Sequence, residues 1–114
     1  MTPATDELIA EYRSTAIAWD VLQSDAKKAN PLFDRLHVLF KQLRTEQSGR
    51  DAIAALMDDP ATGVRLMAAG HSLAWAPEKA IRALETIEAG HGLHAVTAKY
   101  TLKSFREGRL NMDW

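Results

Sequence analysis

The stretch Asp59–Leu73, with the sequence DPATGVRLMAAGHSL, decides how this chain folds. An acidic residue and a proline form a turn that leads directly into a helical segment. This segment begins with Val-Arg, continues with two alanines and ends with a leucine. Thr62 is expected to cap the helix formed by this segment, and the helix extends to about residue 74. The pattern is typical of stacked helical hairpins, and it predicts the architecture more firmly than any function.

The size and charge of the chain place it among single-domain globular proteins. Its 114 residues fit one domain, and 46% of them are hydrophobic, which excludes a disordered chain. The formal net charge is only −1. A dedicated nucleic-acid-binding domain usually carries a basic excess, so nucleic acid is an unlikely partner.

Several chemistries are excluded by composition. There are no cysteines, so disulfides, thiolate catalysis and cysteine-ligated zinc are absent. The N-terminus is polar and acidic, and no segment approaches the roughly 20 apolar residues that cross a bilayer. We therefore expect a soluble, cytoplasmic protein with no membrane partner.

The first part of the chain predicts two long helices, over residues 5–47. Apolar residues recur at three- and four-residue steps from residue 8 to residue 22 and again from residue 32 to residue 43. Asn30-Pro31 is interpreted as the start of the second helix, because proline tolerates only the first turn. A short helical lead-in over residues 25–29 and a kink at the proline are expected, and Ser48-Gly49 is expected to break the second helix.

The second part predicts shorter helices over residues 50–57, 62–74, 77–89 and 93–107. Pro77 begins the third of these, the run Gly90-His91-Gly92 ends it, and Gly108 stops the last one. No β-branched residues alternate with polar ones, so the fold is expected to be all-α, with about six helices.

An internal repeat connects the shorter helices. The sequence AIAAL at residues 52–56 returns as AIRAL at residues 80–84, twenty-eight positions later. A repeated unit of two helices predicts a short solenoid, with hairpins at 49–76 and 77–107 and a tail at 108–114. The N-terminal helices are expected to act as a cap or an extra layer. In the tail, Met112 and Trp114 either pack back onto the last hairpin or form a dimer contact.

The quoted stretch resembles the second half of a HEAT repeat, in which an Asp-Pro turn precedes a helix carrying Val-Arg, paired alanines and a terminal leucine. The resemblance implies that Asp59 and Arg65 tie neighbouring units together. Over residues 7–110 the chain is similar to a family of small bacterial proteins classed as a domain of unknown function. The shared segments are ANPLFDRLH at 29–37 and VRLMAA at 64–69. This similarity implies an armadillo-like helical architecture and no established reaction.

A polar cluster on the second helix is the most distinctive chemical feature of the chain. Asp34 and His37 are three residues apart and share a helical face, with Asn30 and Arg35 nearby. A carboxylate that orients an imidazole is typical of general bases, but no nucleophile or second acid stands beside the pair. The favoured interpretation is a polar junction between the N-terminal layer and the repeats.

Histidines elsewhere in the chain raise the question of a metal site. His91 and His94 are three apart, and His71 lies on the preceding hairpin, so a three-histidine zinc site is conceivable. His91 sits between two glycines, however, and no Asp or Glu falls at metal-ligand spacing nearby. Neither a metal nor a cofactor is expected.

The outward faces of the second helices in each unit are the candidate binding surface, because this row lines the concave side of a solenoid. The residues expected to contact a partner are Met67, His71, Trp75, Lys99, Tyr100 and Lys103. The alternative is that Met67 and Trp75 simply pack against the two N-terminal helices.

The sequence as a whole favours a non-enzymatic module that binds another protein, in its sharper form an immunity or inhibitor protein. Phosphate loops, nucleophile elbows and dinucleotide fingerprints are missing. The first alternative is a nucleic-acid-associated helical repeat, since Lys99, Lys103, Arg106 and Arg109 lie near the C-terminal end. The less favoured alternative is an enzyme centred on Asp34 and His37.

Overall fold

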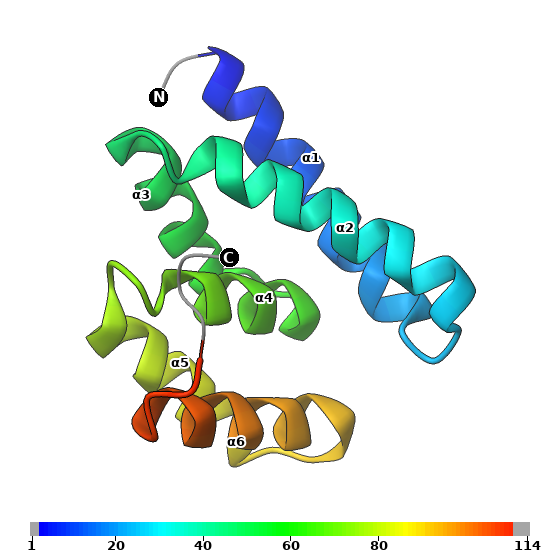
Figure 1. Ribbon diagram of the computed structural model, residues 1–114, viewed down its shortest axis with the longest axis vertical. Helices are drawn as coiled ribbons and strands as arrows, with labels where there is room; N and C mark the ends of the chain where they lie inside the picture. The colour runs from blue at the N-terminus through cyan, green and yellow to red at the C-terminus, as the bar shows by residue number, and fades with distance from the viewer. Residues whose placement is uncertain (1–2, 111–114) are drawn as a thin grey trace.

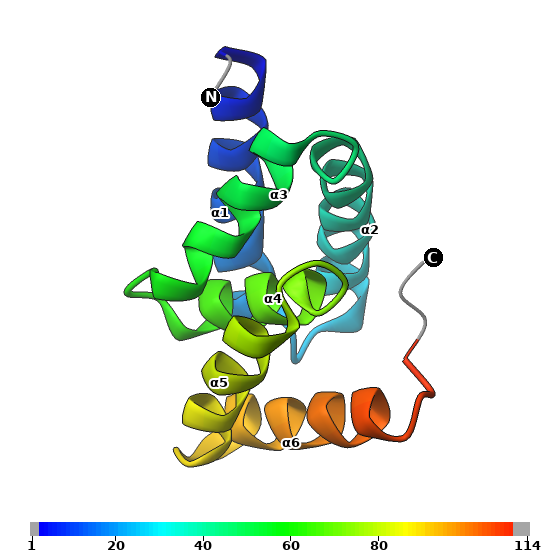
Figure 2. The same ribbon diagram turned by 90° about the vertical axis from the view of Figure 1, so that its left-hand side faces the viewer.

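Two long helices, α1 (Pro3–Leu22) and α2 (Ala26–Leu43), form the N-terminal layer of the computed structural model, which describes residues 3–110. They lie side by side, joined by a short turn (Figures 1 and 2). The spacing of the apolar residues explains the pairing, because Leu36, Phe40 and Leu43 share one face of α2 and are all buried. Tyr12 and Ala16 of α1 are buried in the same core.

The start of α2 differs from the prediction. The helix begins at Ala26, and Pro31 lies inside it rather than at its first position. The amides of Lys28 and Ala29 already donate to the carbonyl of Asp25, so the helical pattern is established before the proline. Pro31 removes one backbone hydrogen bond, to the carbonyl four residues earlier, within the first two turns of an exposed helix end. The prediction that the second helix starts at Asn30-Pro31 is therefore wrong.

The break after α2 also lies earlier than predicted. The turn covers residues 44–46, and Ser48 and Gly49 belong to the first turn of α3 (Gln47–Ala55). A Cβ atom on Gly49 would lie 1.8 Å from the carbonyl oxygen of Leu43. Glycine at this position therefore permits a close approach of α3 to the end of α2, where the sequence pattern indicates only a helix breaker.

Helix α4 (Thr62–Ser72) lies at the centre of the molecule. A short 3-10 helix, η1 (Leu56–Asp58), leads from α3 to the turn before it. Packing partners of α4 are α1, α3, α5 and α6, which explains why eight of its residues are buried. The helix starts at Thr62 itself, and the hydroxyl of this residue accepts a hydrogen bond from Arg65 instead of capping the helix.

Helices α5 (Pro77–Glu88) and α6 (Gly92–Arg106) form the last pair. Pro77 opens α5, as predicted. Gly108 adopts a φ of 70° just beyond α6, and the amide of Arg109 donates to the carbonyl of Ser104, which closes the helix end. In Figure 2, α6 runs crosswise to the N-terminal layer, and α4 lies between them.

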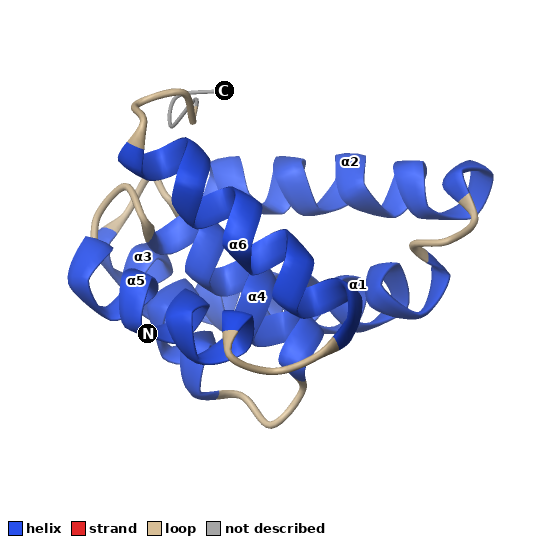
Figure 3. Cartoon of the chain, turned by 90° about the horizontal axis from the view of Figure 1, so that it is seen from below, coloured by secondary structure: helices blue, strands red, loops and turns tan. Residues whose placement is uncertain are grey.

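The expected all-α class is confirmed for residues 3–110, which form six α-helices in hairpin-like pairs and the 3-10 turn η1. Figure 3 shows helices and loops and no strand in this part of the chain. No helix within it is both long and apolar enough to span a bilayer. The expectations for Met112 and Trp114 lie outside the described residues.

Candidate functional site

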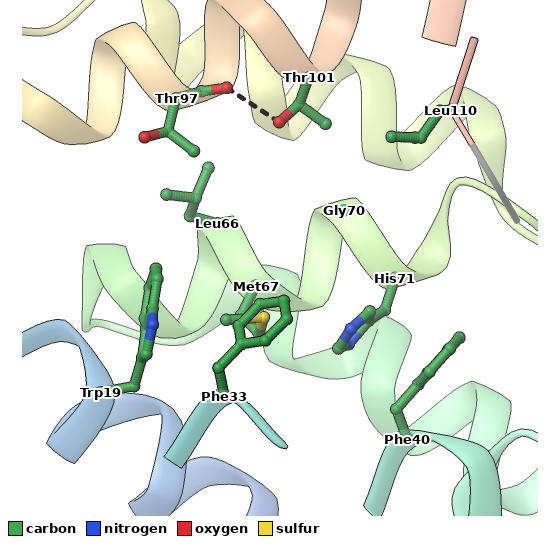
Figure 4. Close-up of a pocket in the computed structure, with 10 residues that line it drawn as sticks. All are labelled: Trp19, Phe33, Phe40, Leu66, Met67, Gly70, His71, Thr97, Thr101 and Leu110. Atoms are coloured by element: carbon green, nitrogen blue, oxygen red, sulfur yellow. Dashed lines mark hydrogen bonds between the residues drawn. The ribbon is translucent and has the colours of Figure 1, made fainter. Parts of the chain in front are cut away.

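An apolar pocket lies where the N-terminal layer, α4 and α6 meet (Figure 4). Its volume is about 240 Å³. Helix α4 contributes four lining residues, and the others come from α1, α2, α6 and the segment after α6. The lining residues are Trp19, Phe33, Phe40, Leu66, Met67, Gly70, His71, Thr97, Thr101 and Leu110.

The space on the α4 side exists because residue 70 is a glycine. Leu66, Met67, Gly70 and His71 fall on one side of α4, since residues four apart share a helical face. A Cβ atom built on Gly70 would meet no atom within 4 Å beyond its chain neighbours and the backbone of α4. The pocket therefore opens where an ordinary side chain would project from the last turn of the helix.

His71 is a buried polar residue in the lining of the pocket. Its Nδ1 atom lies 2.7 Å from the hydroxyl of Tyr12, and both side chains are buried. Burial lowers the pKa of His71 to about 3, with help from the positive charges of His37 and Arg44. Burial also raises the pKa of Tyr12 well above its ordinary value. Both groups are therefore neutral at physiological pH.

Aromatic rings surround this histidine. The ring of Phe40 stacks on His71 with centroids 4.1 Å apart and an angle of 10° between the planes. Trp75 stacks on Phe40 at 5.9 Å, and the guanidinium of Arg44 lies 4.8 Å from the Phe40 ring centroid. Phe40 thus fixes the imidazole from one face, and Tyr12 fixes it through Nδ1.

Outside the pocket, the outer face of α6 carries a stripe of exposed apolar side chains. Of the six large hydrophobic side chains exposed among residues 3–110, three lie on this helix, at positions 93, 96 and 100. Their exposed fractions are 56% for Leu93, 48% for Val96 and 58% for Tyr100. Lys99 and Lys103 lie along one edge of this stripe and are also exposed. Ala98 and Leu102 face the opposite way, into the core.

The structure divides the predicted partner-binding strip into two groups. Met67 and His71 are buried and line the pocket, and Trp75 is half-buried against Phe40. The expectation that they form one open strip with Lys99, Tyr100 and Lys103 is wrong. The physical reason is that α1 and α2 cover α4, as the alternative interpretation held, whereas nothing among residues 3–110 covers the outer face of α6.

The predicted polar junction on α2 has a different role. Arg35 makes two hydrogen bonds to the carboxylate of Glu11, the longer of them 2.8 Å, so it joins α2 to α1 within the N-terminal layer. Asn30 and Asp34 are exposed, and His37 is half-buried beside Phe40. Burial and the charges of Lys41 and Arg44 lower the pKa of His37, and Asp34 opposes them with the smallest influence of the four.

The side chains of Asp59 and Arg65 do not pair in the predicted way. The carboxylate of Asp59 binds Arg13 of α1 at 2.7 Å and accepts the amide of Ala61 at 2.9 Å. Arg65 donates instead to the backbone carbonyls of Asp59 and Pro60. Asp59 therefore ties the turn before α4 to the N-terminal layer, and Arg65 stabilises the turn from within.

The three histidines of the conceivable zinc site are engaged separately. His94 lies 2.6 Å from the carboxylate of Asp20, across 74 residues of sequence, and His91 is exposed. His71 is committed to Tyr12. Among residues 3–110, no group of three or more metal-ligating side chains comes together.

Sequence reasoning misses several residues of the pocket. Trp19 and Phe33 line the pocket, and Tyr12 contacts His71 beside it. By their spacing, all three are simply core positions of the two N-terminal helices. This periodicity predicts a buried face but does not indicate which helix covers it. A glycine in the last turn of α4 is the available signal, because a small residue between large ones leaves space beside the helix.

Comparisons with known proteins identify the family and add no activity. A family model described as a domain of unknown function, DUF2019, matches residues 6–106. The protein RPA1889 from Rhodopseudomonas palustris CGA009 has a similar crystal structure, with a TM-score of 0.85 and 29% sequence identity, covering 97% of this chain and 93% of that one. No curated protein matches. The chain belongs to the DUF2019 family of domains of unknown function.

Proposed function

We propose that this protein is a non-enzymatic interaction module that binds another protein on the outer face of α6. The observation that carries the proposal is the stripe of Leu93, Val96 and Tyr100, which are roughly half-exposed at three- and four-residue spacing. A contiguous apolar stripe on the surface is unfavourable unless a partner covers it. A tyrosine in such a stripe is well suited to anchor a partner, because it buries a large ring and keeps a polar tip.

The charges beside the stripe favour an acidic amphipathic helix as the partner. Lys99 and Lys103 are exposed one helical turn apart, in a row along one edge of the stripe, because residues four apart share a helical face. A partner helix with apolar residues at i, i+3 and i+7 and carboxylates along one flank matches this face in both shape and charge.

The architecture supports the same proposal. We infer that the hairpin-like pairs α3–α4 and α5–α6 are compact HEAT-like repeats, and that α6 is the last helix of the array. In such an array each unit buries the face of its neighbour, so the terminal helix keeps one face available for a partner. In the sharper form of the proposal, the partner is a toxin or enzyme that this protein inhibits.

The charges near the C-terminal end count against nucleic acid as the partner. Arg106 lies 3.3 Å from Glu85, and Arg109 pairs with Glu107. Two of the four cationic residues in this region therefore have a carboxylate beside them, which reduces the positive field that would attract phosphates.

No observation favours the enzyme centred on Asp34 and His37. Asp34 is exposed, and its influence on the pKa of His37 is the smallest of those acting on that group. Neither residue lines the apolar pocket.

The proposal is tested by site-specific cross-linking in cells of the source organism. A photoreactive amino acid at position 100 is expected to give one discrete cross-linked protein. The same amino acid at position 38 is the matched control, because Val38 is a comparably exposed apolar residue on α2. Equal cross-linking from both positions, or none from position 100, would contradict the assignment of the binding face.

The identified partner then allows a quantitative test. Lys103→Glu is expected to weaken binding by about tenfold at low salt and by less at high salt, because added salt screens the attraction between exposed charges. Lys28→Glu, at an exposed lysine on α2, is the control and is expected to leave the affinity unchanged.

A further inference from the structure

We propose that the pocket between α1, α2, α4 and α6 is a binding site for a small neutral aromatic molecule that carries one hydrogen-bond acceptor. This inference goes beyond the proposed function, because the pocket is lined by Thr97 and Thr101 of α6, whereas the protein-binding face is formed by Leu93, Val96 and Tyr100. A ligand in the pocket and a partner on α6 would therefore bind at separate places.

The size of the pocket sets the size of the ligand. A cavity of about 150 Å³ is large enough for benzene, so the volume of about 240 Å³ here fits one substituted ring or two fused rings. Apart from the adjacent residues and the backbone of α4 itself, no atom comes within 4 Å of the point where a Cβ atom of residue 70 would lie. The pocket is therefore present without rearrangement of α4.

The lining favours an aromatic ligand. Trp19, Phe33 and Phe40 come from the N-terminal layer, and Met67 comes from α4 (Figure 4). Flat rings pack against such side chains by offset stacking and edge-to-face contacts, and a methionine sulfur adds a favourable contact with a ring. A flexible aliphatic chain gains less from the same surroundings, because it loses conformational freedom on binding.

The charge of the lining favours a neutral ligand. None of the ten lining residues has a carboxylate, an ammonium or a guanidinium group. His71 is neutral because burial holds its pKa far below 6.5. An ionised ligand would lose its hydration in this pocket and find no opposite charge to compensate.

His71 defines a hydrogen bond that the ligand can make. Tyr12 keeps its proton, and His71 Nδ1 lies 2.7 Å from its hydroxyl, so we assign Tyr12 as the donor and Nδ1 as the acceptor. In the neutral imidazole the proton is then on Nε2, the ring nitrogen left for a ligand. A ligand oxygen that accepts from Nε2 satisfies this donor, and phenol is the simplest such molecule.

The test is a titration of the full-length protein with phenol, followed by NMR shifts of the amides of Gly70, Thr97 and Thr101. Saturable shifts at these residues are expected. Benzoate and benzylammonium, which have similar size but carry a charge, are expected to bind at least about tenfold more weakly, because each must be desolvated.

Two substitutions at one position supply the control. Gly70→Phe places a ring in the open space and is expected to weaken phenol binding by more than about tenfold, whereas Gly70→Ala fills little of it and keeps binding within about threefold. Thr97→Leu reduces the space from the α6 side and gives a second blocked variant if Gly70→Phe folds poorly. Tyr100→Ala is expected to leave phenol binding unchanged.

Three results would overturn the proposal. One is the absence of saturable shifts in the wild-type protein, and another is equal phenol affinity in the wild type and in well-folded Gly70→Phe and Thr97→Leu. The third is a wild-type dimer by sedimentation that becomes monomeric in Gly70→Phe. That result would identify a second copy of the chain as the occupant.

Discussion

His71 shows how a single residue is determined by its surroundings. The imidazole is buried, its Nδ1 faces the hydroxyl of Tyr12, and one of its faces stacks on Phe40. Each of these contacts suits the neutral ring, and burial makes the protonated ring unfavourable, which lowers the pKa of His71 to about 3. The residue therefore contributes to stability in a way that depends on pH.

The first prediction concerns the stability of the protein between pH 7 and pH 5. Below pH 6.5 the unfolded chain binds a proton at residue 71, whereas the folded protein does not until the pH approaches 3. Protonation therefore favours unfolding, and the free energy of unfolding falls as the pH drops through this window. The slope for one such group is at most about 1.4 kcal/mol per pH unit. Urea unfolding at several pH values measures it.

A non-titrating substitution separates the contribution of this histidine. His71→Gln is expected to be less stable at pH 7 but to show a shallower pH dependence, with the remainder due to groups such as His37, whose pKa is also lowered. His91→Gln, at an exposed histidine, is expected to retain the wild-type dependence. Identical slopes for His71→Gln and the wild type would contradict the explanation.

At the scale of the elements, the glycines show how closely the helices approach one another. A Cβ atom on Gly49 would lie 1.8 Å from the backbone of α2, and one on Gly63 would lie 2.5 Å from the side chain of Asp20 on α1. A Cβ atom on Gly70 would meet nothing. Three glycines within helices thus have three different surroundings, and only one of them adjoins open space.

The second prediction compares two identical substitutions in helices. Gly49→Ala is expected to destabilise the protein by about 1–3 kcal/mol, because the backbone of α2 must move away from the new methyl group. Gly70→Ala is expected to stabilise it by about 0.5–1 kcal/mol, since alanine favours a helix and no atom is in the way. Thermal or urea unfolding measures both, and effects of the same sign would contradict the packing described for α3 and α2.

At the scale of the whole molecule, side chains of α1 make polar contacts with distant parts of the chain. Arg13 binds Asp59 in the turn before α4, and Asp20 lies 2.6 Å from His94 near the start of α6. Each contact joins residues more than 40 positions apart. The N-terminal layer is therefore fixed to the rest of the protein by specific polar contacts in addition to the apolar core.

The third prediction compares two arginine–carboxylate pairs. Arg13→Ala is expected to lower the urea midpoint of unfolding more than Arg35→Ala does, because it leaves the side chain of Asp59, only 8% exposed, without its guanidinium. Glu11, the partner of Arg35, is about half-exposed and can be solvated by water. A larger loss in Arg35→Ala would show that the Arg13 tie contributes little to the attachment of the layer.

Much of the helical structure is predictable from local sequence, and the errors have local causes. Pro77 and Gly108 occupy the helix ends expected of them, because the preferences of proline and glycine act over one turn. The predictions at Pro31 and Gly49 are wrong, since a well-formed helical start and a close helix–helix approach override the same preferences. The candidate site is less predictable, because Tyr12, Trp19 and Phe33 carry the same periodic signal as any core residue.

Local sequence is sufficient for the all-α class, the six helices and the hairpin-like pairing, because periodicity, turn residues and short connections act between neighbours along the chain. Three features depend on how the whole molecule packs. Asp59 binds Arg13 of α1, and the N-terminal layer buries Met67 and His71. Helix α6, in contrast, keeps an exposed apolar face. These outcomes depend on which helix faces cover one another. That arrangement follows from packing between distant segments, and it is not encoded in any single stretch of sequence.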